Sequence, residues 1–342
     1  FSALHEAVQS NRVQVVATLL AAGANVSTLD ACGRTPVHFV KSVLMAQMLY
    51  AEGADVDHRD KIGDRLMRTA WINGRMRIVR FLIGLGVTLA GINVDTRDNG
   101  GWTALFYSAS MGCSTMTRVL IENGASVCLY DQQGKTPLHY AVESRNPEMV
   151  RLLCDNGAAV DAVSPDGTPL FLAVQGGCND VIQLLVEEFN ADVAFALPGT
   201  INTVLHRAVL LNTPICIVRM LVQRGADVNA TDTFGHTPLH YAIRTDTVEL
   251  ATFLVEQCSV DLSIRFKGAS FLHDAVRYSR RWAVDLLMKH GANIADKDLK
   301  GWDALFTTVC LADLDLARVL LEKHGAIVDT KNMNGLDAMH IA

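Results

Sequence analysis

Thr136-Pro137-Leu138-His139 is the clearest copy of a short block that recurs along the chain and decides its fold. The block is a Ser, Thr or Asp, then usually a Pro or a small residue, then an aliphatic or Met anchor, then often a His. The anchors are Leu4, Val37, Met67, Leu105, Leu138, Leu170, Leu205, Leu239, Leu272, Leu305 and Met339. The first anchor is at position 4 and the eleventh at position 339, ten steps later, so the mean period is about 33.5 residues. A fixed period of this length indicates a repeat array, in which each unit packs against its neighbours.

One unit shows how such an array is built. Asp131-Gln132-Gln133-Gly134 predicts a tight turn. Thr136 then stands at the N-cap of a first helix, and Pro137 occupies its first turn, where a missing N–H has no consequence. Pro147 begins a second helix, and Gly157 ends it. Neither helix exceeds about ten residues, which is too short to be stable alone in water, so we expect stability to come from stacking of neighbouring units.

The units also share the residues that begin and end them. A glycine lies four residues before the anchor at Gly33, Gly63, Gly101, Gly134, Gly235, Gly268, Gly301 and Gly335. Gly-Ala-Asn or Gly-Ala-Asp closes four units, at residues 23–25, 53–55, 225–227 and 291–293. This order of turn, Thr-Pro-Leu-His, two short helices and Gly-Ala-Asp resembles the ankyrin repeat over essentially the whole chain. The resemblance implies an all-α solenoid of stacked helix pairs with projecting β-turn fingers, in which the fingers and the first helices line a concave groove.

We expect a single array over residues 1–342, truncated at both ends. Its approximate units are residues 1–29, 30–59, 60–97, 98–130, 131–163, 164–197, 198–231, 232–264, 265–297, 298–331 and a partial 332–342. Three places depart from the period: the first helix of the second unit is short at Val40-Lys41-Ser42, extra residues around Gly86–Asp98 lengthen the third finger, and the junction Asn190–Thr200 is longer and contains Pro198. We predict local irregularity at all three.

The composition argues against several classes of function. A net charge of −6 does not suit a general binder of nucleic acid or of anionic membranes. No apolar run approaches the roughly 18 residues of a membrane span, so direct membrane insertion is not expected. The eight cysteines are scattered without a Cys-x-x-Cys pair, which favours free thiols in a reducing compartment. We therefore expect a monomeric intracellular array, cytoplasmic or nuclear, that binds protein partners.

Regularly spaced histidines raise the question of catalysis or metal binding. Seven of the eleven histidines belong to the repeated block: His5, His38, His139, His206, His240, His273 and His340. Successive copies lie a whole repeat apart, and in the ankyrin family this His bonds to turn or capping groups. The sequence contains no phosphate-binding glycine loop, nucleophile elbow or His-Glu-x-x-His motif. We predict that the protein is not an enzyme and takes no metal or cofactor.

The position after the repeat His faces the groove in ankyrin repeats, and here it carries a row of large residues. Tyr107, Tyr140 and Leu172 hold it in three consecutive units, a pattern that suits an apolar segment of a partner. Apolar residues also stand at the expected finger tips. The predicted partner-binding set is Trp102, Tyr107, Lys135, Tyr140, Leu172, Phe234 and Tyr241. The alternative is structural: each Tyr packs on its neighbours, and the Trp folds against the adjacent finger.

Two further features are candidate sites. The third unit is locally basic in an acidic chain, with Arg65, Arg68, Arg75, Arg77 and Arg80 as a docking patch for an acidic or phosphate-bearing partner, or else as a solvated helix face. Arg65 also replaces the capping residue. Asn229 lies in a Val-Asn pair eight residues after Leu221, which resembles the finger asparagines that are β-hydroxylated in ankyrin repeats.

The predicted function is non-catalytic protein–protein recognition, as a scaffold or adaptor arm of a larger protein. Two alternatives stay open. The array could be the cytoplasmic arm of a membrane channel or toxin, which flanking spans of about 20 apolar residues would identify. It could also recruit substrates for a ubiquitin-ligase adaptor or another enzyme, such as a kinase. The partner is not predicted, because repeat surfaces vary while the framework stays fixed.

Overall fold

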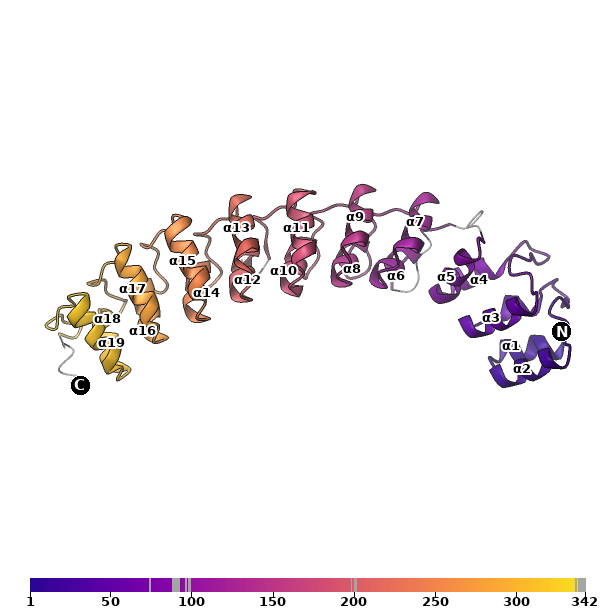
Figure 1. The fold of residues 1–342 in the computed structure, drawn as a ribbon, viewed down its shortest axis with the longest axis horizontal. Coiled ribbons are helices and arrows are strands. Elements are labelled where there is room, and N and C mark those ends of the chain that lie inside the picture. Colours follow the sequence, from indigo (N-terminus) through magenta and orange to yellow (C-terminus); the bar gives the residue numbers. More distant parts are fainter. Residues whose placement is uncertain are drawn as a thin grey trace. The chain divides into compact units, whose positions relative to one another are not determined.

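The computed structural model describes residues 1–73, 75–87, 93–95, 97, 100–197, 199, 202–335 and 337. It divides into two compact units, Phe1–Ala162 (unit 1) and Val163–Ala342 (unit 2). Almost all regular structure in the described residues is short helices that come in pairs (Figure 1). The predicted all-α array of stacked helix pairs is therefore confirmed.

The described residues of unit 1 form five helix pairs. They are α1 (Ala3–Gln9) with α2 (Val13–Ala21), the 3₁₀ helix η1 (Pro36–Phe39) with α3 (Val43–Ala51), α4 (Leu66–Ile72) with α5 (Met76–Gly84), α6 (Ala104–Ser110) with α7 (Ser114–Glu122), and α8 (Pro137–Glu143) with α9 (Pro147–Asp155). First helices pack on first helices of the next pair, as α6 does on α8, and second helices do the same. Phe106 of α6 is fully buried at such a contact.

Unit 2 continues the same scheme. Its pairs are α10 (Pro169–Gly176) with α11 (Asn179–Glu187), α12 (Val204–Leu210) with α13 (Ile215–Gln223), α14 (Pro238–Arg244) with α15 (Val248–Gln257), α16 (Phe271–Arg277) with α17 (Arg281–Lys289), and α18 (Ala304–Cys310) with α19 (Leu314–Arg318) and the π-type turn η2 (Val319–Lys323). Two short strands, β1 (Ala196–Leu197) and β2 (Asn202–Thr203), form an antiparallel pair before α12. Phe271 and Phe306 are its largest fully buried side chains.

The repeat His, which lies in the first turn of the first helix, helps to cap the N-terminus of that helix. In the unit at α12, the backbone N–H of Thr203 donates to His206 Nδ1 at 3.3 Å, and the backbone N–H of His206 donates to Thr203 Oγ1, also at 3.3 Å. This reciprocal capping box satisfies N–H groups that a helix start leaves unpaired. The same box forms at Ser2, Thr35, Thr136, Thr237 and Ser270. The structural interpretation of these histidines is confirmed; His340 lies outside the described residues, as does the eleventh anchor, Met339.

The other imidazole nitrogen links one repeat to the next. Because Nδ1 accepts a backbone N–H, the ring proton lies on Nε2, and Nε2 donates to a carbonyl of the neighbouring finger. His206 Nε2 lies 3.0 Å from the carbonyl oxygen of His236, and His273 Nε2 lies 2.8 Å from that of Trp302. In unit 1, His5 Nε2 lies 3.0 Å from the carbonyl oxygen of Arg34.

An aspartate shapes the fingers. Asp131 Oδ1 accepts the backbone N–H groups of Gln133 and Lys135, at 2.8 and 2.9 Å. Gly134, at φ +74°, makes the left-handed turn that the sequence predicted. Asp232 folds its finger by the same two bonds in unit 2. The carboxylate thus adds to the backbone hydrogen bond of the turn itself, which runs from the N–H of Gly134 to the carbonyl oxygen of Asp131 at 3.1 Å.

Two of the three expected irregularities are confirmed. η1 has four residues where the other first helices have at least seven, and Val40 after it is extended (φ −61°, ψ 132°). The junction Asn190–Thr200 contributes β1 to the β1–β2 pair, an addition to the plain finger. Pro198 and Thr200 lie outside the described residues, and so does most of the lengthened third finger, at 88–92, 96 and 98.

The capping box predicts a specific stability effect. Replacement of Thr203 by Ala removes the hydroxyl that accepts from His206, and we expect the free energy of unfolding of unit 2 to fall by about 1 kcal/mol. Thr203→Ser keeps the hydroxyl and should cost much less. Urea denaturation of both variants measures this difference. Equal losses for the two substitutions would show that the methyl group, and not the cap, stabilises the helix.

Candidate functional site

The predicted aromatic row in unit 1 packs around one carboxylate. Tyr140 Oη donates to Asp131 Oδ2 at 2.6 Å, and Trp102 Nε1 donates to the same oxygen at 3.2 Å. The Trp102 ring centroid lies 4.7 Å from that of Tyr140 and 4.8 Å from that of Tyr107. Tyr140 is only 8% exposed. Tyr140, predicted as a partner-binding groove residue, thus presents little surface, because its hydroxyl is held by the aspartate nine residues earlier.

The hydrogen bonds of this cluster shift its ionisation. Burial by itself raises the pKa of Asp131, but bonds from Tyr140, from two backbone N–H groups and from Trp102 outweigh it and lower that pKa. Burial and the bond to Asp131 raise the pKa of Tyr140. At physiological pH, Tyr140 is therefore a neutral phenol that donates a hydrogen bond to the ionised carboxylate of Asp131. Such a bond stabilises the fold.

Three more members of the predicted set are buried. Tyr241 repeats the arrangement of Tyr140: it is 8% exposed, donates to Asp232 Oδ2 at 2.6 Å, and has its pKa raised to about 12 by burial and by that bond. Leu172 is buried in unit 2. Lys135 is buried too, with Nζ 2.7 Å from Glu143 Oε1. These residues present little surface to a partner. The partly exposed Trp102 and Tyr107 and the finger tip Phe234, 66% exposed, do present surface.

The five arginines of the third unit do not form one patch. Arg65 is buried, with Nη1 2.8 Å from Asp57 Oδ1, and Arg68 pairs with Asp64. The carboxylates of Asp57 and Asp64 thus compensate the charges of these two members of the predicted docking patch. Arg75 Nη1 donates to the carbonyl oxygen of Val40 at 2.8 Å. Arg77 and Arg80 are exposed on α5, and neither forms an ion pair with a described residue.

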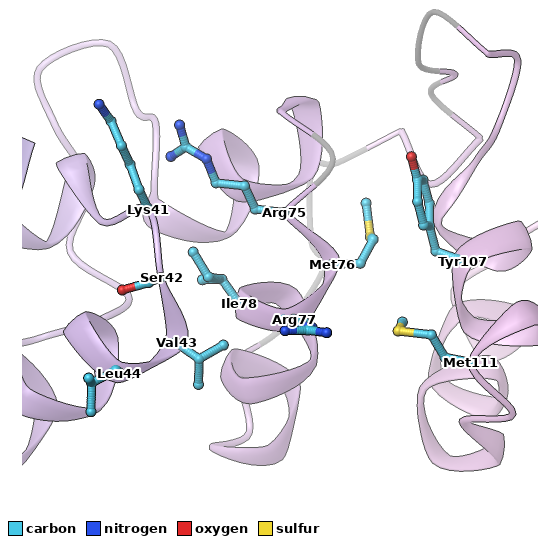
Figure 2. Close-up of a pocket in the computed structure, with 10 residues that line it drawn as sticks. All are labelled: Lys41, Ser42, Val43, Leu44, Arg75, Met76, Arg77, Ile78, Tyr107 and Met111. Carbon is cyan, nitrogen blue, oxygen red and sulfur yellow. The ribbon is translucent and has the colours of Figure 1, made fainter. Parts of the chain in front are cut away.

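The short η1 helix adjoins a groove in unit 1, called the α5 groove below. Its first hollow has a volume of about 580 Å³ and is lined by Lys41, Ser42, Val43, Leu44, Arg75, Met76, Arg77, Ile78, Tyr107 and Met111. Figure 2 shows Arg77 between Val43 and Met111, with Lys41 and Arg75 reaching towards the same side of the hollow. Because η1 ends at Phe39, the extended chain from Val40 runs beside the start of α5, where Arg75 fastens it.

A second hollow continues this groove along α5. It has a volume of about 700 Å³, and it shares Val43, Arg77 and Met111 with the first. Arg80, Phe81, Gly84 and Leu85 line the rest. The floor of the α5 groove is therefore apolar and its rim is cationic. Sequence reasoning found the arginines but missed the floor, although the short helix at Val40-Lys41-Ser42 pointed to a gap beside them.

A buried polar pair in unit 2 departs from the bonding pattern of the other repeat histidines. His240 forms the capping box with Thr237, but its Nε2 has no hydrogen-bond partner among the described residues, and the ring lies against Phe271 with centroids 4.2 Å apart. Asp274 Oδ2 lies 3.8 Å from His240 Nε2. Burial lowers the pKa of His240 to about 3 and raises that of Asp274 to about 6, although Arg277 and Arg244 oppose the rise at Asp274. The neutral His240 ring therefore does not offset the burial of the Asp274 carboxylate, whose Oδ1 lies 3.4 Å from Arg277 Nη1.

Comparison with known proteins agrees with this geometry. Family models described as ankyrin repeats match residues 4–40, 39–131, 124–196 and 205–298. The chain belongs to the ankyrin repeat family. Ankyrin repeats are generally protein–protein interaction modules.

Individual ankyrin relatives resemble parts of the chain. An ankyrin repeat protein of fowlpox virus is 33% identical over 125 residues, which are 35% of this chain and 29% of the relative. The mouse B-cell lymphoma 3 protein homolog is 35% identical over 125 residues, 35% of this chain and 28% of the relative. The crystal structure of the ankyrin repeat domain of Bcl-3 aligns at a TM-score of 0.51 and 28% identity, covering 66% of this chain and 98% of that domain. The chain thus matches under a third of the length of the fowlpox virus protein and of the mouse homolog.

Three remaining expectations concern metal, membrane and modification. Among the described residues no cluster of three or more His, Cys, Asp or Glu side chains could hold a metal ion. None of the helices in the described ranges has the length and apolarity to cross a bilayer. Asn229 is partly exposed, and its Oδ1 accepts the backbone N–H of Asp261 at 2.9 Å. Its hydroxylation stays a prediction.

The Tyr140–Asp131 bond predicts a stability loss. Tyr140→Phe removes a hydrogen bond to a carboxylate, and we expect the free energy of unfolding of unit 1 to fall by about 2 kcal/mol. Tyr50→Phe is the matched control, because Tyr50 is exposed and its ring, not its hydroxyl, makes its contact, with Phe81. Denaturant titration of both variants measures the difference. A loss for Tyr140→Phe no larger than that of Tyr50→Phe would contradict the structural role.

The His240–Asp274 pair predicts a pH dependence. With its folded pKa raised, Asp274 holds a proton in folded unit 2 between about pH 4 and 6 that the unfolded chain releases. Its contribution to stability therefore falls as pH rises through this window. We expect the free energy of unfolding of Asp274→Asn to be close to that of the wild type at pH 4. At pH 7.5 it should exceed the wild-type value by on the order of 2 kcal/mol. Asp329→Asn, at an exposed site, is the control; a pH-independent effect of Asp274→Asn would refute this assignment.

Proposed function

We propose that the chain is a non-catalytic protein-interaction array, the scaffold or adaptor arm of a larger intracellular protein, and that it receives a partner protein at the α5 groove. The observation that carries the proposal is the open apolar floor of this groove. Leu44 is 53% exposed and Met111 is 42% exposed, and both line the same hollow. Large apolar side chains gathered around a concavity mark interaction sites more often than scattered ones do.

The framework histidines support the non-catalytic part of this proposal. A general base needs an available lone pair within reach of a substrate. In His5, His38, His206 and His273 the Nδ1 lone pair accepts the cap backbone N–H, and Nε2 points at a carbonyl oxygen. Burial lowers the pKa of His38, His206 and His273, although hydrogen bonds to backbone groups oppose it. These rings are engaged in the fold.

The remaining accessible members of the predicted set extend the proposed surface. Trp102 and Tyr107 belong to the repeat that follows α5, and Tyr107 lines the first hollow of the α5 groove. Phe234 is an exposed finger tip of unit 2. A membrane-protein arm and a substrate-recruiting arm of an enzyme both stay compatible with a partner-binding groove, because either would use the array for recognition.

Affinity capture with a groove variant tests the proposal. We expect the double substitution Leu44→Ser and Met111→Ser to lose partner proteins that the wild-type chain retains from a cell extract. The control chain, Val248→Ser with Leu314→Ser, removes two apolar residues that are 47% and 74% exposed on α15 and α19, and it should retain these partners. Both pairs are exposed, so changes in unfolding free energy should stay within about 1 kcal/mol. Identical capture by all three chains would contradict the groove as the partner site.

A further inference from the structure

The lining of the α5 groove carries charge of one sign. Lys41, Arg75, Arg77 and Arg80 line its two hollows, and no Asp or Glu does. This stands out in a chain whose net charge is −6. Arg75 already donates to Val40, but Lys41, Arg77 and Arg80 form no ion pair within the described part of the chain. The rim therefore has uncompensated cations that an acidic ligand would neutralise.

The positions of these cations fit a chain-like ligand. Arg77 and Arg80 are three residues apart on α5, so they stand on one helix face about one turn apart. Arg77 borders both hollows, and Arg80 borders the second. Guanidinium groups at this spacing can each form a bidentate pair with a separate carboxylate.

The floor selects against purely anionic ligands. Between the cations lie Val43, Met76, Ile78 and Met111, with Leu44 at the edge. Inorganic phosphate or a nucleic-acid backbone would satisfy the rim and leave this apolar surface in water. Methionine side chains adapt to differently shaped apolar groups, which suits a partner's side chains. An amphipathic peptide segment satisfies both surfaces at once.

We propose that the α5 groove binds an acidic amphipathic segment of a partner protein, with its large apolar side chains on the floor and its carboxylates paired to Arg77, Arg80 and Lys41. This inference rests on the proposed function and adds the chemistry of the partner. Its energy comes chiefly from the buried apolar side chains, and the charge pairs set the selectivity and the rate of association.

Three synthetic peptides test this chemistry with the purified 342-residue chain. The first is a 16-residue fluorescein-labelled helix former with Leu at i, i+3, i+4 and i+7 spacing and Glu on its flanks. The second replaces every Glu by Lys, and the third replaces every Leu by Ser. Fluorescence anisotropy should show binding of the first at least about tenfold tighter than of either other peptide, and weakening as salt rises from 50 to 500 mM. Equal binding of the Lys peptide, or of the Ser peptide, overturns the inference.

Charge reversal locates the binding. Arg77→Glu with Arg80→Glu should weaken the first peptide by at least about tenfold, because two attractive pairs become repulsive. Arg281→Glu places one such change on an exposed face of α17 in unit 2 and should alter binding less than about twofold. Thermal unfolding checks that each variant is folded. An effect of Arg281→Glu comparable to that of Arg77→Glu alone would show a general charge effect and refute the assignment.

Two further probes separate the inference from its alternatives. Single-stranded DNA and phosphatidylserine-containing vesicles should bind more weakly than the acidic peptide and fail to displace it; the reverse order would assign the rim to those anions instead. If groove-dependent capture from extract succeeds but the peptide panel shows no charge preference, the proposed function stands and this inference fails. If the peptide binds as described but no captured protein depends on Leu44 and Met111, the proposed function fails.

Discussion

In the repeats of His5, His38, His206 and His273, one imidazole joins the repeat to the next. Nδ1 of the capping His belongs to its own helix start, and Nε2 donates to the carbonyl that precedes the cap of the following unit, as in His206 with His236. One side chain therefore sets both where the first helix begins and how the next finger lies against it. The positions of the fingers, of the helix faces and of the hollows between them depend on this pair of hydrogen bonds, because the short helices have little stability alone.

At the α5 groove the hydrogen bonds of the repeat His are kept, but the first helix of the repeat, η1, is shortened. Thr35 and His38 form the capping box of η1, and His38 Nε2 still reaches the carbonyl oxygen of Asp64, at 3.3 Å. The stacking of repeats is thereby preserved in the described residues. The first helix nonetheless stops at Phe39, and an extended segment with a cation-lined hollow takes the place of its last turn. The proposed recognition surface thus lies at a departure from the repeat, where packing with neighbours no longer dictates each residue.

The sequence predicted the periodic features well because they are local. The cap, the turn glycine and the two short helices each depend on residues within a few positions, so period and composition were sufficient. The site was predicted less well. Tyr140 and Tyr241 were predicted to contact a partner, but both are buried, and each hydroxyl reaches an aspartate nine residues away through a folded finger. Arg65 and Arg68 were counted with Arg77 and Arg80, although sequence spacing does not show that carboxylates at Asp57 and Asp64 neutralise them.

The apolar floor escaped prediction for a related reason. Val43, Met76 and Met111 come from three different helix pairs, and only the stacking of those pairs brings them to one hollow. In the linear sequence each looks like an ordinary core residue. The same holds for Asp274, whose proximity to His240 depends on the stacking of two neighbouring repeats.

Amide hydrogen exchange with and without the acidic amphipathic peptide tests the central claim most directly. The account predicts that saturating peptide slows exchange in α3, in α5 and at the end of α6, and leaves the helices of unit 2 unchanged. Protection confined to unit 2, or protection of unit 1 that omits α5, would contradict the claim that the cation-rimmed groove beside the shortened helix is where this array receives its partner.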